Sequence, residues 1–338
     1  MPSSTDVNQR QLIRIAQLYY EEDRTQEEIA ARLRLSRSKV VRLLQEARRA
    51  GIVQIRIVAP QQTSFDLERR LERHFDLRQA IVVDTGGLRE EGIRPAVGAE
   101  AAYFLGEVLR SGDVLAMSSG TTLAATVDAM MPLRTTDITI VEVEGAPNED
   151  IPLPEYSTYE LATRLAPLIH AQYRMIPVPR EFGSREMAEI IRADVRIQRT
   201  LALARAANVL LIGVSSLDPI APTLSHLTAD ILDPLKAGGA VGEIAARFFD
   251  AAGKPCPSAF DDRLIGLELA DFLPIPVRIG VTFGRHKVPA IAGALRGGYV
   301  NVLVTDSRTA SALLEYASDR EAKARERQAD AAGVAAGW

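Results

Sequence analysis

A short turn at Ser119-Gly120-Thr121-Thr122 carries the residue types that suit phosphate binding. It follows the apolar run Val114–Met117, which predicts a strand, and it precedes a stretch that predicts a helix. Such a turn offers free backbone N–H groups, hydroxyls and the positive end of a helix, which together suit an anion. Because Ser and Thr also cap many helices with nothing bound, two interpretations stay open: an anion site and a plain helix cap.

The strands and helices predicted around this turn indicate an α/β domain. Short apolar runs bounded by Gly, Asp or Pro predict strands, and helical stretches lie between most of them. These runs are Ala80–Val83, Val114–Met117, Ile138–Val143, Val209–Ile212, Val277–Val281 and Val300–Val304. Their order predicts a doubly wound, Rossmann-like fold with a mostly parallel sheet and helices on both faces. In such folds, ligands bind at the carboxyl ends of the strands.

The first sixty residues predict three helices. In the first, apolar residues recur at helical spacing, namely Leu12, Ile15, Ala16 and Tyr19. Thr25 with Glu28 three residues later forms a capping box that opens the second helix. Ser36 is the cap of the third, whose apolar stripe is Val40, Leu43, Leu44 and Ala47. Gly51 ends that helix, and the alternating residues 52–57 predict a short strand.

The spacing of these helices favours a winged helix-turn-helix that binds operator DNA. Ala30 is the small residue that lets two helices cross closely, and Arg34 occupies the turn position where glycine is common. The strand 52–57 would be the wing. The exposed face of the third helix would contact phosphates and base edges; its residues are Arg37, Ser38, Lys39, Arg42 and Gln45. The alternative is a generic three-helix bundle with a basic surface.

Composition and charge agree with a small DNA-binding domain joined to a larger body. Residues 1–60 hold eleven Lys and Arg against seven Asp and Glu, a balance of +4, so the net charge of −4 leaves −8 on the remainder. No apolar run is long enough to span a membrane, and Cys256 is the single cysteine. The four histidines show no ligand spacing. We therefore expect a cytoplasmic protein with no metal, no cofactor and no membrane partner.

Three segments stand out in the body: Gly112–Leu123, Gly238–Asp250 and Val281–Asp306. In that order, behind a helix-turn-helix, they resemble the SorC family of sugar-responsive bacterial transcriptional regulators. The resemblance covers roughly residues 10–316. It implies an effector domain similar to sugar-phosphate isomerases and deaminases that has lost catalysis. It also implies a homo-oligomer, dimer or tetramer, often a repressor, whose DNA affinity changes when a phosphorylated sugar binds.

The resemblance assigns roles to particular residues of this chain. The turn from Ser119 to Thr122 matches the family's phosphate-binding loop, and Lys287 matches its anion-contacting lysine. Glu243 stands where many members have an acid that faces the sugar hydroxyls. Phe283 departs from the pattern, because a second glycine is frequent there.

Glu144 is the departure with chemical consequences. Relatives place Lys, Arg or Asn at this strand end, whereas a glutamate can neither form a Schiff base nor clamp a second phosphate. It can accept hydrogen bonds from hydroxyls. We therefore expect a non-covalent effector with at most one phosphate. The alternative is that Glu144 turns away and pairs with a nearby arginine.

The expected domains are a winged helix-turn-helix over 1–58, a linker over 59–64, an effector and oligomerisation domain over 65–319, and a flexible tail over 320–338. The expected function is a regulator, not an enzyme, controlled by a sugar, polyol or sugar monophosphate. A fused, active sugar-phosphate isomerase or deaminase is the alternative, with Glu144 or Glu243 as the base. A third alternative is a body that only oligomerises.

Overall fold

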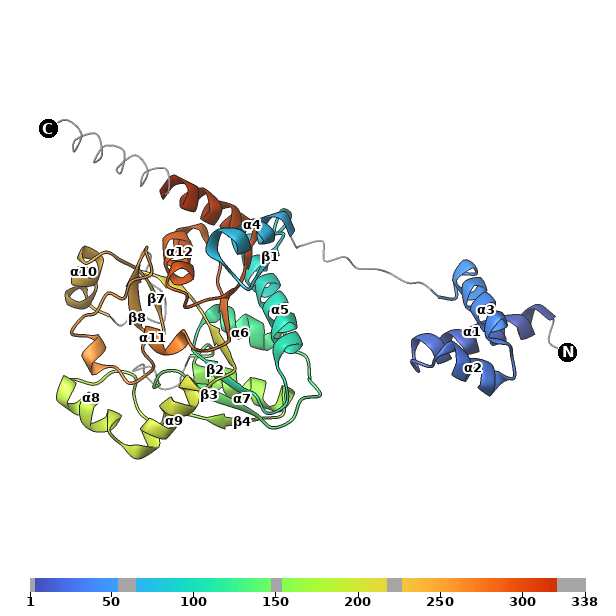
Figure 1. The fold of residues 1–338 in the computed structure, drawn as a ribbon, viewed down its shortest axis with the longest axis horizontal. Helices are drawn as coiled ribbons and strands as arrows, with labels where there is room; N and C mark the ends of the chain where they lie inside the picture. Colours follow the sequence, from blue (N-terminus) through green and yellow to red (C-terminus); the bar gives the residue numbers. More distant parts are fainter. Residues whose placement is uncertain (1–3, 54–64, 147–153, 218–226, 321–338) are drawn as a thin grey trace. The chain divides into compact units, whose positions relative to one another are not determined.

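The chain divides into two compact units, Met1–Gln61 and Gln62–Trp338. The structure, a computed structural model, describes residues 4–53, 65–146, 154–217 and 227–320 (Figure 1). Most of the predicted wing, the predicted linker and the predicted tail beyond 320 lie outside the described residues. Among the described residues, no helix is both long and apolar enough to cross a membrane.

Within residues 4–53, the small unit consists of α1 (Ser4–Tyr20), α2 (Gln26–Leu33) and α3 (Arg37–Arg49). Ile15, Val40 and Ala47 of the predicted stripes are fully buried in its core, together with Ile29 of α2. The small residue Ala30 is also buried, as a close crossing of two helices requires.

Both predicted helix caps of the small unit are confirmed. The Thr25 hydroxyl accepts the Glu28 N–H at 3.3 Å, and the Glu28 carboxylate accepts the Thr25 N–H at 2.8 Å. The Ser36 hydroxyl accepts the Lys39 N–H at 3.2 Å. Arg34 in the turn has φ 53° and ψ 45°, the left-handed conformation that costs a non-glycine residue about 1–2 kcal/mol. The turn therefore keeps the usual geometry without the usual glycine.

The large unit is built on a seven-stranded sheet in which every neighbouring pair is parallel. In spatial order the strands are β1 (Gln79–Val83), β10 (Val302–Asp306), β9 (Val277–Val281), β5 (Val209–Ile212), β2 (Val114–Met117), β3 (Ile138–Glu142) and β4 (Ala171–Arg174). From β2 the chain moves outward through β3 to β4, and from β5 it moves outward in the opposite direction. The boundary between β2 and β5 is therefore the topological switch point, where such folds bind ligands.

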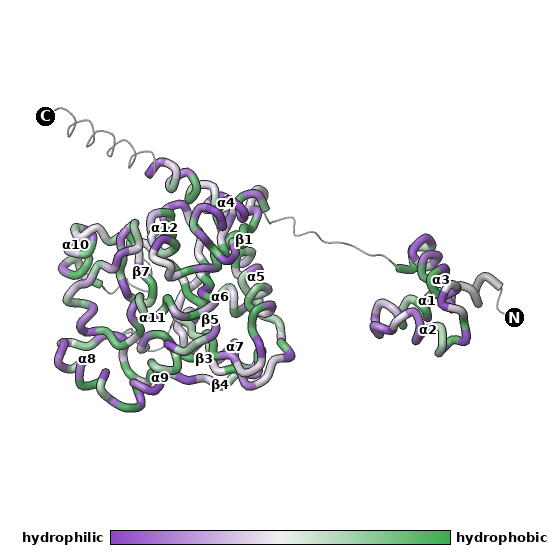
Figure 2. Tube along the Cα trace, in the orientation of Figure 1, coloured by the Kyte–Doolittle hydropathy of each residue, from purple (hydrophilic) through white to green (hydrophobic). Residues whose placement is uncertain are grey.

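Helices cover both faces of this sheet, as predicted for a doubly wound fold. Alternation along the strands feeds two separate cores, since Leu211 packs on one face and its neighbour Leu210 on the other. One face is covered by α5 (Glu90–Val108), α6 (Thr121–Asp128) and α7 (Thr158–Leu168). The other is covered by α4 (Phe65–Phe75), α9 (Val195–Arg205), α12 (Val288–Arg296) and a helix over 307–320. Figure 2 shows hydrophobic stretches on the strands and mixed hydropathy along the helices.

The edge strand β4 and a second sheet were not predicted. The second sheet is antiparallel and contains β6 (Ser215–Ser216), β7 (Ala240–Ile244) and β8 (Arg247–Asp250). Both adjacent aromatics of β8, Phe248 and Phe249, are buried as core residues. The remaining helices are α8 (Arg185–Arg192), α10 (Ala229–Ala237), α11 (Leu269–Phe272) and the short 3-10 helices η2 (Asp261–Arg263) and η3 (Arg285–Lys287).

Candidate DNA-binding face and effector pocket

The five predicted DNA-binding residues lie on the solvent-facing side of α3. Arg37, Ser38, Lys39, Arg42 and Gln45 are all exposed, while Val40 and Leu43 on the opposite side are buried. Arg37 makes an exposed ion pair with Glu27 at 2.9 Å. Exposed pairs of this kind contribute little to stability, so the arginine is free to exchange its partner for a phosphate.

A cavity of about 670 Å³ opens at the carboxyl ends of β2, β3, β5 and β9 in the large unit. It lies at the switch point between β2 and β5. All seven residues predicted to contact an effector line it: Ser119, Gly120, Thr121, Thr122, Glu144, Glu243 and Lys287. The tertiary structure thus brings together residues that are separated by up to 168 positions in the chain (287 − 119).

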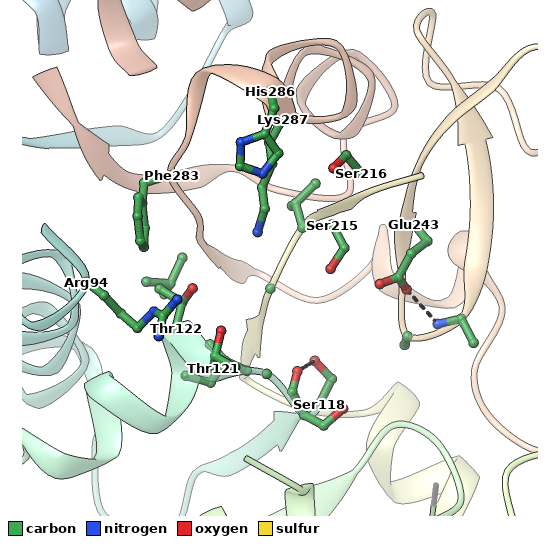
Figure 3. Close-up of a pocket in the computed structure, with 18 of the residues that line it drawn as sticks. Arg94, Ser118, Thr121, Thr122, Ser215, Ser216, Glu243, Phe283, His286 and Lys287 are labelled. Carbon is green, nitrogen blue, oxygen red and sulfur yellow. Dashed lines mark hydrogen bonds between the residues drawn. The ribbon is translucent and has the colours of Figure 1, made fainter. Parts of the chain in front are cut away.

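One end of the pocket is formed by the start of α6. Gly120 is the N-cap, with φ 150° and ψ 149°, and the described residues supply no side-chain cap. Among the hydrogen bonds described for this helix start, none is accepted by a hydroxyl of the Ser-Gly-Thr-Thr turn; the anion site stays a prediction. A helix start leaves its first N–H groups without partners inside the helix. Thr121 and Thr122 add hydroxyls at the same place (Figure 3).

Lys287 reaches this end from the loop between β9 and α12. The loop is held in place because the Gly284 N–H donates to the Thr309 hydroxyl at 2.8 Å, and that hydroxyl donates to Asp306. Burial lowers the pKa of Lys287, with Glu243 raising it and Arg94 lowering it further. In Figure 3 the Lys287 ammonium points into the cavity toward Thr121 and Thr122.

The opposite end of the pocket holds two buried carboxylates. Glu144 is 5% exposed and accepts a hydrogen bond from Arg180 Nη1 at 3.4 Å, an ion pair in which both side chains are buried. Glu144 therefore does pair with an arginine, as the alternative interpretation held, but it still lines the pocket. Gly145 allows this contact: a Cβ there would lie 2.7 Å from the Val178 carbonyl oxygen and 2.9 Å from the Arg180 nitrogen.

Glu243 approaches the same space from β7. Its carboxylate accepts the Ala246 N–H at 2.9 Å, and Ser215 lies opposite it across the antiparallel pair of β6 and β7. Burial raises the pKa of Glu243, and the neighbouring Glu144 raises it further. Burial likewise raises the pKa of Glu144, while Arg180 lowers it. The two carboxylates thus share one positive neighbour, Arg180.

Comparison with known proteins agrees with this geometry. The family model for a sugar-binding domain matches residues 59–315, and the model for sigma-70 region 4 matches residues 8–50. The deoxyribonucleoside regulator of Bacillus subtilis is 34% identical over 306 residues, covering 89% of this chain and 96% of the relative. The transcriptional regulator LsrR of Escherichia coli K12 is 31% identical, covering 90% and 95%.

Solved structures show the same arrangement of elements. The full-length sorbitol operon regulator SorC from Klebsiella pneumoniae superposes with a TM-score of 0.73 at 28% identity, covering 93% of this chain and 100% of that one. A DeoR family transcriptional regulator from Listeria monocytogenes gives a TM-score of 0.68 at 25% identity, covering 74% and 98%. The chain belongs to the SorC family of sugar-responsive transcriptional regulators.

In this SorC-family chain the pocket contains residues that the sequence interpretation missed. Arg180 follows β4, a strand that was not predicted, and carries no local signal of burial. Ser215 and Ser216 follow β5 just as Ser118 and Ser119 follow β2, so the strand-end rule could have found them. Arg94 lines the pocket from α5. His286 is exposed and also lines the pocket.

Arg180 also changes one argument about the effector of this SorC-family protein. The limit of one phosphate was expected because a glutamate at position 144 cannot clamp a second phosphate. Arg180 places a buried guanidinium 3.4 Å from Glu144, and the pair carries no net charge when both groups are ionised. The limit of one phosphate therefore has a weaker basis than the sequence suggested.

Proposed function

We propose that this protein is a DNA-binding transcriptional repressor of carbohydrate metabolism genes, controlled by a sugar, polyol or sugar monophosphate. The observation that carries the proposal is the two-ended pocket at the switch point of the large unit. Hydroxyls, a helix start and Lys287 lie at one end, and the carboxylates of Glu144 and Glu243 lie at the other. A phosphate suits the first end, and sugar hydroxyls suit the second.

The proposed role of the pocket is sensing without turnover. A general base must be able to reach a substrate proton with a free carboxylate or imidazole. Glu144 is held by Arg180, and Glu243 is engaged by the Ala246 N–H. Both carboxylates are therefore placed to hold hydroxyls. The expected effector is non-covalent, with its hydroxyl end toward Glu144.

The same proposal covers the partners and the location of the protein. A helix-turn-helix of this size reads a palindromic site as a dimer or a larger assembly, so a homo-oligomer is expected. Because operator DNA lies in the bacterial cytoplasm, the protein would work there.

A melting-temperature screen tests the proposal. The full chain is mixed with free sugars, polyols and sugar monophosphates, and each compound that raises the melting temperature is assayed for operator binding and for turnover. A compound that stabilises the protein, changes operator affinity and is recovered unchanged supports the proposal. Turnover would favour an enzyme, and a complete lack of stabilisation would favour a body that only oligomerises.

A matched pair of variants ties the response to the pocket. Lys287→Ala removes a charge-assisted contact, so the effector concentration needed for response should rise at least about tenfold. Operator binding without effector should stay the same. Arg285→Ala is the control, since Arg285 is exposed two residues away and does not line the pocket. A normal response of Lys287→Ala would remove this lysine from the site.

A further inference from the structure

The anion end of the pocket has a second cation that the sequence did not identify. Arg94 of α5 and Lys287 both line the cavity, and in Figure 3 their charged ends point into the space beside Thr121 and Thr122. Among the described residues, neither side chain forms a hydrogen bond or an ion pair. Two cations therefore face the same part of the cavity.

The packing of α5 on α6 explains why Arg94 lies there. Gly98 is one turn after Arg94 on the same helix face. A Cβ at Gly98 would lie 2.6 Å from the Ala125 carbonyl carbon and 2.8 Å from the Ala125 Cβ, so the two helices touch at this point. This contact holds the N-terminal half of α5, including Arg94, beside α6. Arg94 is thus positioned by the fold, although its side chain is exposed.

Arg94 and Lys287 place two like charges at this end of the pocket. Burial lowers the pKa of Lys287, Glu243 raises it, and Arg94 lowers it. Glu91, one turn before Arg94, also lines the pocket, but it is exposed and makes no ion pair with Arg94 among the described residues. A bound anion would relieve the repulsion between the two cations, and a dianion would relieve it more than a monoanion.

We propose that Arg94 is a direct contact for the anionic group of the effector, and that any preference of the pocket for a phosphate ester over the same sugar without its phosphate depends on Arg94 as well as on Lys287. The planar guanidinium can give two parallel hydrogen bonds to phosphate oxygens, whereas Lys287 acts as a point charge. The inference rests on the proposed function, because it names the group that decides which sugar compounds are sensed.

Arg94→Gln tests the contact with inorganic phosphate as the probe. The wild type, Arg94→Gln and the control Arg285→Gln are titrated with phosphate, and with sulfate as a dianion of constant charge, at fixed ionic strength. Arg94→Gln should weaken phosphate binding at least about tenfold, and Arg285→Gln should change it less than about twofold. The melting temperature of unliganded Arg94→Gln should match or exceed that of the wild type, because the substitution removes a repulsion. Equal phosphate binding by Arg94→Gln and wild type would overturn the proposal.

A second measurement separates this inference from the proposed function. Each phosphorylated compound that changes operator affinity is compared with its dephosphorylated twin. The wild type should prefer the phosphorylated form, and Arg94→Gln should lose most of that preference while its response to the free sugar is kept. An unchanged preference in Arg94→Gln overturns the role of Arg94 alone. If no sugar compound changes operator affinity in the wild type, the proposed function itself fails.

Discussion

Helices in the DNA-binding unit and helices at the pocket begin in different ways. In α2 and α3 the first turn is satisfied by the chain itself, through the hydroxyls of Thr25 and Ser36. In α6, whose N-cap is Gly120, no side-chain cap is found among the described residues. By contrast, α12 continues from the 3-10 helix η3, where the N–H groups of Lys287 and Val288 donate to Gly284 and Arg285. A self-capped start has a structural role that is complete without a ligand. An uncapped start at a cavity leaves donors available for one.

The comparison extends to charge. Between Arg10 and Val53, the charged residues of the small unit lie on the surface, where α3 presents a basic face. The large unit buries several, and those with the smallest exposed fractions are Glu142, Glu144, Glu243, Arg180, Arg247 and Asp306. DNA binding should therefore depend on exposed groups whose removal leaves folding intact, whereas changes at the buried charges of the large unit should alter stability and ligand binding together.

The largest effect should come from the exposed face of α3. Replacing Arg37, Lys39 and Arg42 together with Ala should weaken operator binding at least about a thousandfold, or about 4 kcal/mol. Arg42→Ala alone should cost about 1–3 kcal/mol if it reads a base. The melting temperature should stay close to that of the wild type, because all three side chains are exposed. Operator binding measured across salt concentrations checks this, and an unchanged affinity and salt slope in the triple variant would refute the assignment of α3.

Stability that depends on pH should come from the large unit, with Glu142 as a main source. Its carboxylate accepts hydrogen bonds from the Tyr173 hydroxyl and the Ile176 N–H. Burial raises the pKa of Glu142 from 4.5 to about 7. Between these values the folded chain holds a proton that the unfolded chain has released. The free energy of unfolding should therefore fall as pH rises through this window, by up to about 3 kcal/mol.

Glu142→Gln should remove much of that fall, because the amide does not titrate. Unfolding by denaturant at several pH values between about 4 and 8 measures it. Glu315→Gln, at an exposed site in the helix over 307–320, is the control and should keep the wild-type slope. A slope in Glu142→Gln as steep as in the wild type would assign the effect to other carboxylates.

Gly145→Ala should couple stability to the effector site. The added methyl would meet the backbone of Val178, Pro179 and Arg180 at under 3.0 Å, so the loop that carries Arg180 must shift. We expect a loss of about 1–3 kcal/mol in the free energy of unfolding, together with weaker effector binding. Gly183→Ala is the control, because a Cβ there meets nothing within 4 Å. If Gly145→Ala were as stable as Gly183→Ala, the loop that carries Arg180 could move without a cost in stability, and the prediction would be wrong.

The smallest effect distinguishes the two kinds of helix start directly. Ser36→Ala should lower the free energy of unfolding by about 1 kcal/mol, because it removes a cap. Thr121→Ala removes a hydroxyl that caps nothing, so it should leave stability nearly unchanged and weaken effector binding by about 1 kcal/mol. Denaturant unfolding and effector titration of both variants measure this. The distinction between the two kinds of helix start would be refuted if Thr121→Ala destabilised the protein as much as Ser36→Ala and bound effector normally.

Much of the fold was predictable because the signals are local. The capping box joins residues three apart, and the strands β2, β5 and β9 match the predicted apolar runs. The weaker elements were missed for a physical reason. In β4 the exposed and half-buried residues alternate without a fully buried position. The two residues of β6 become a strand only because β7 pairs with them.

By itself, the sequence determined the class of each half and placed Ser119 to Thr122 between a strand and a helix, since these signals lie in adjacent residues. The resemblance to the SorC family added Glu144, Glu243 and Lys287, which line the same pocket. Only the tertiary structure decided how the charges are distributed. Arg94 reaches the anion end because Gly98 lets α5 touch α6, and Arg180 reaches Glu144 because Gly145 lets two loops touch. Such contacts depend on backbones that approach each other from distant parts of the chain. The sequence around Arg94 or Arg180 does not show which distant backbone segment lies against it. The charges that meet in the pocket could therefore be identified only from the tertiary structure.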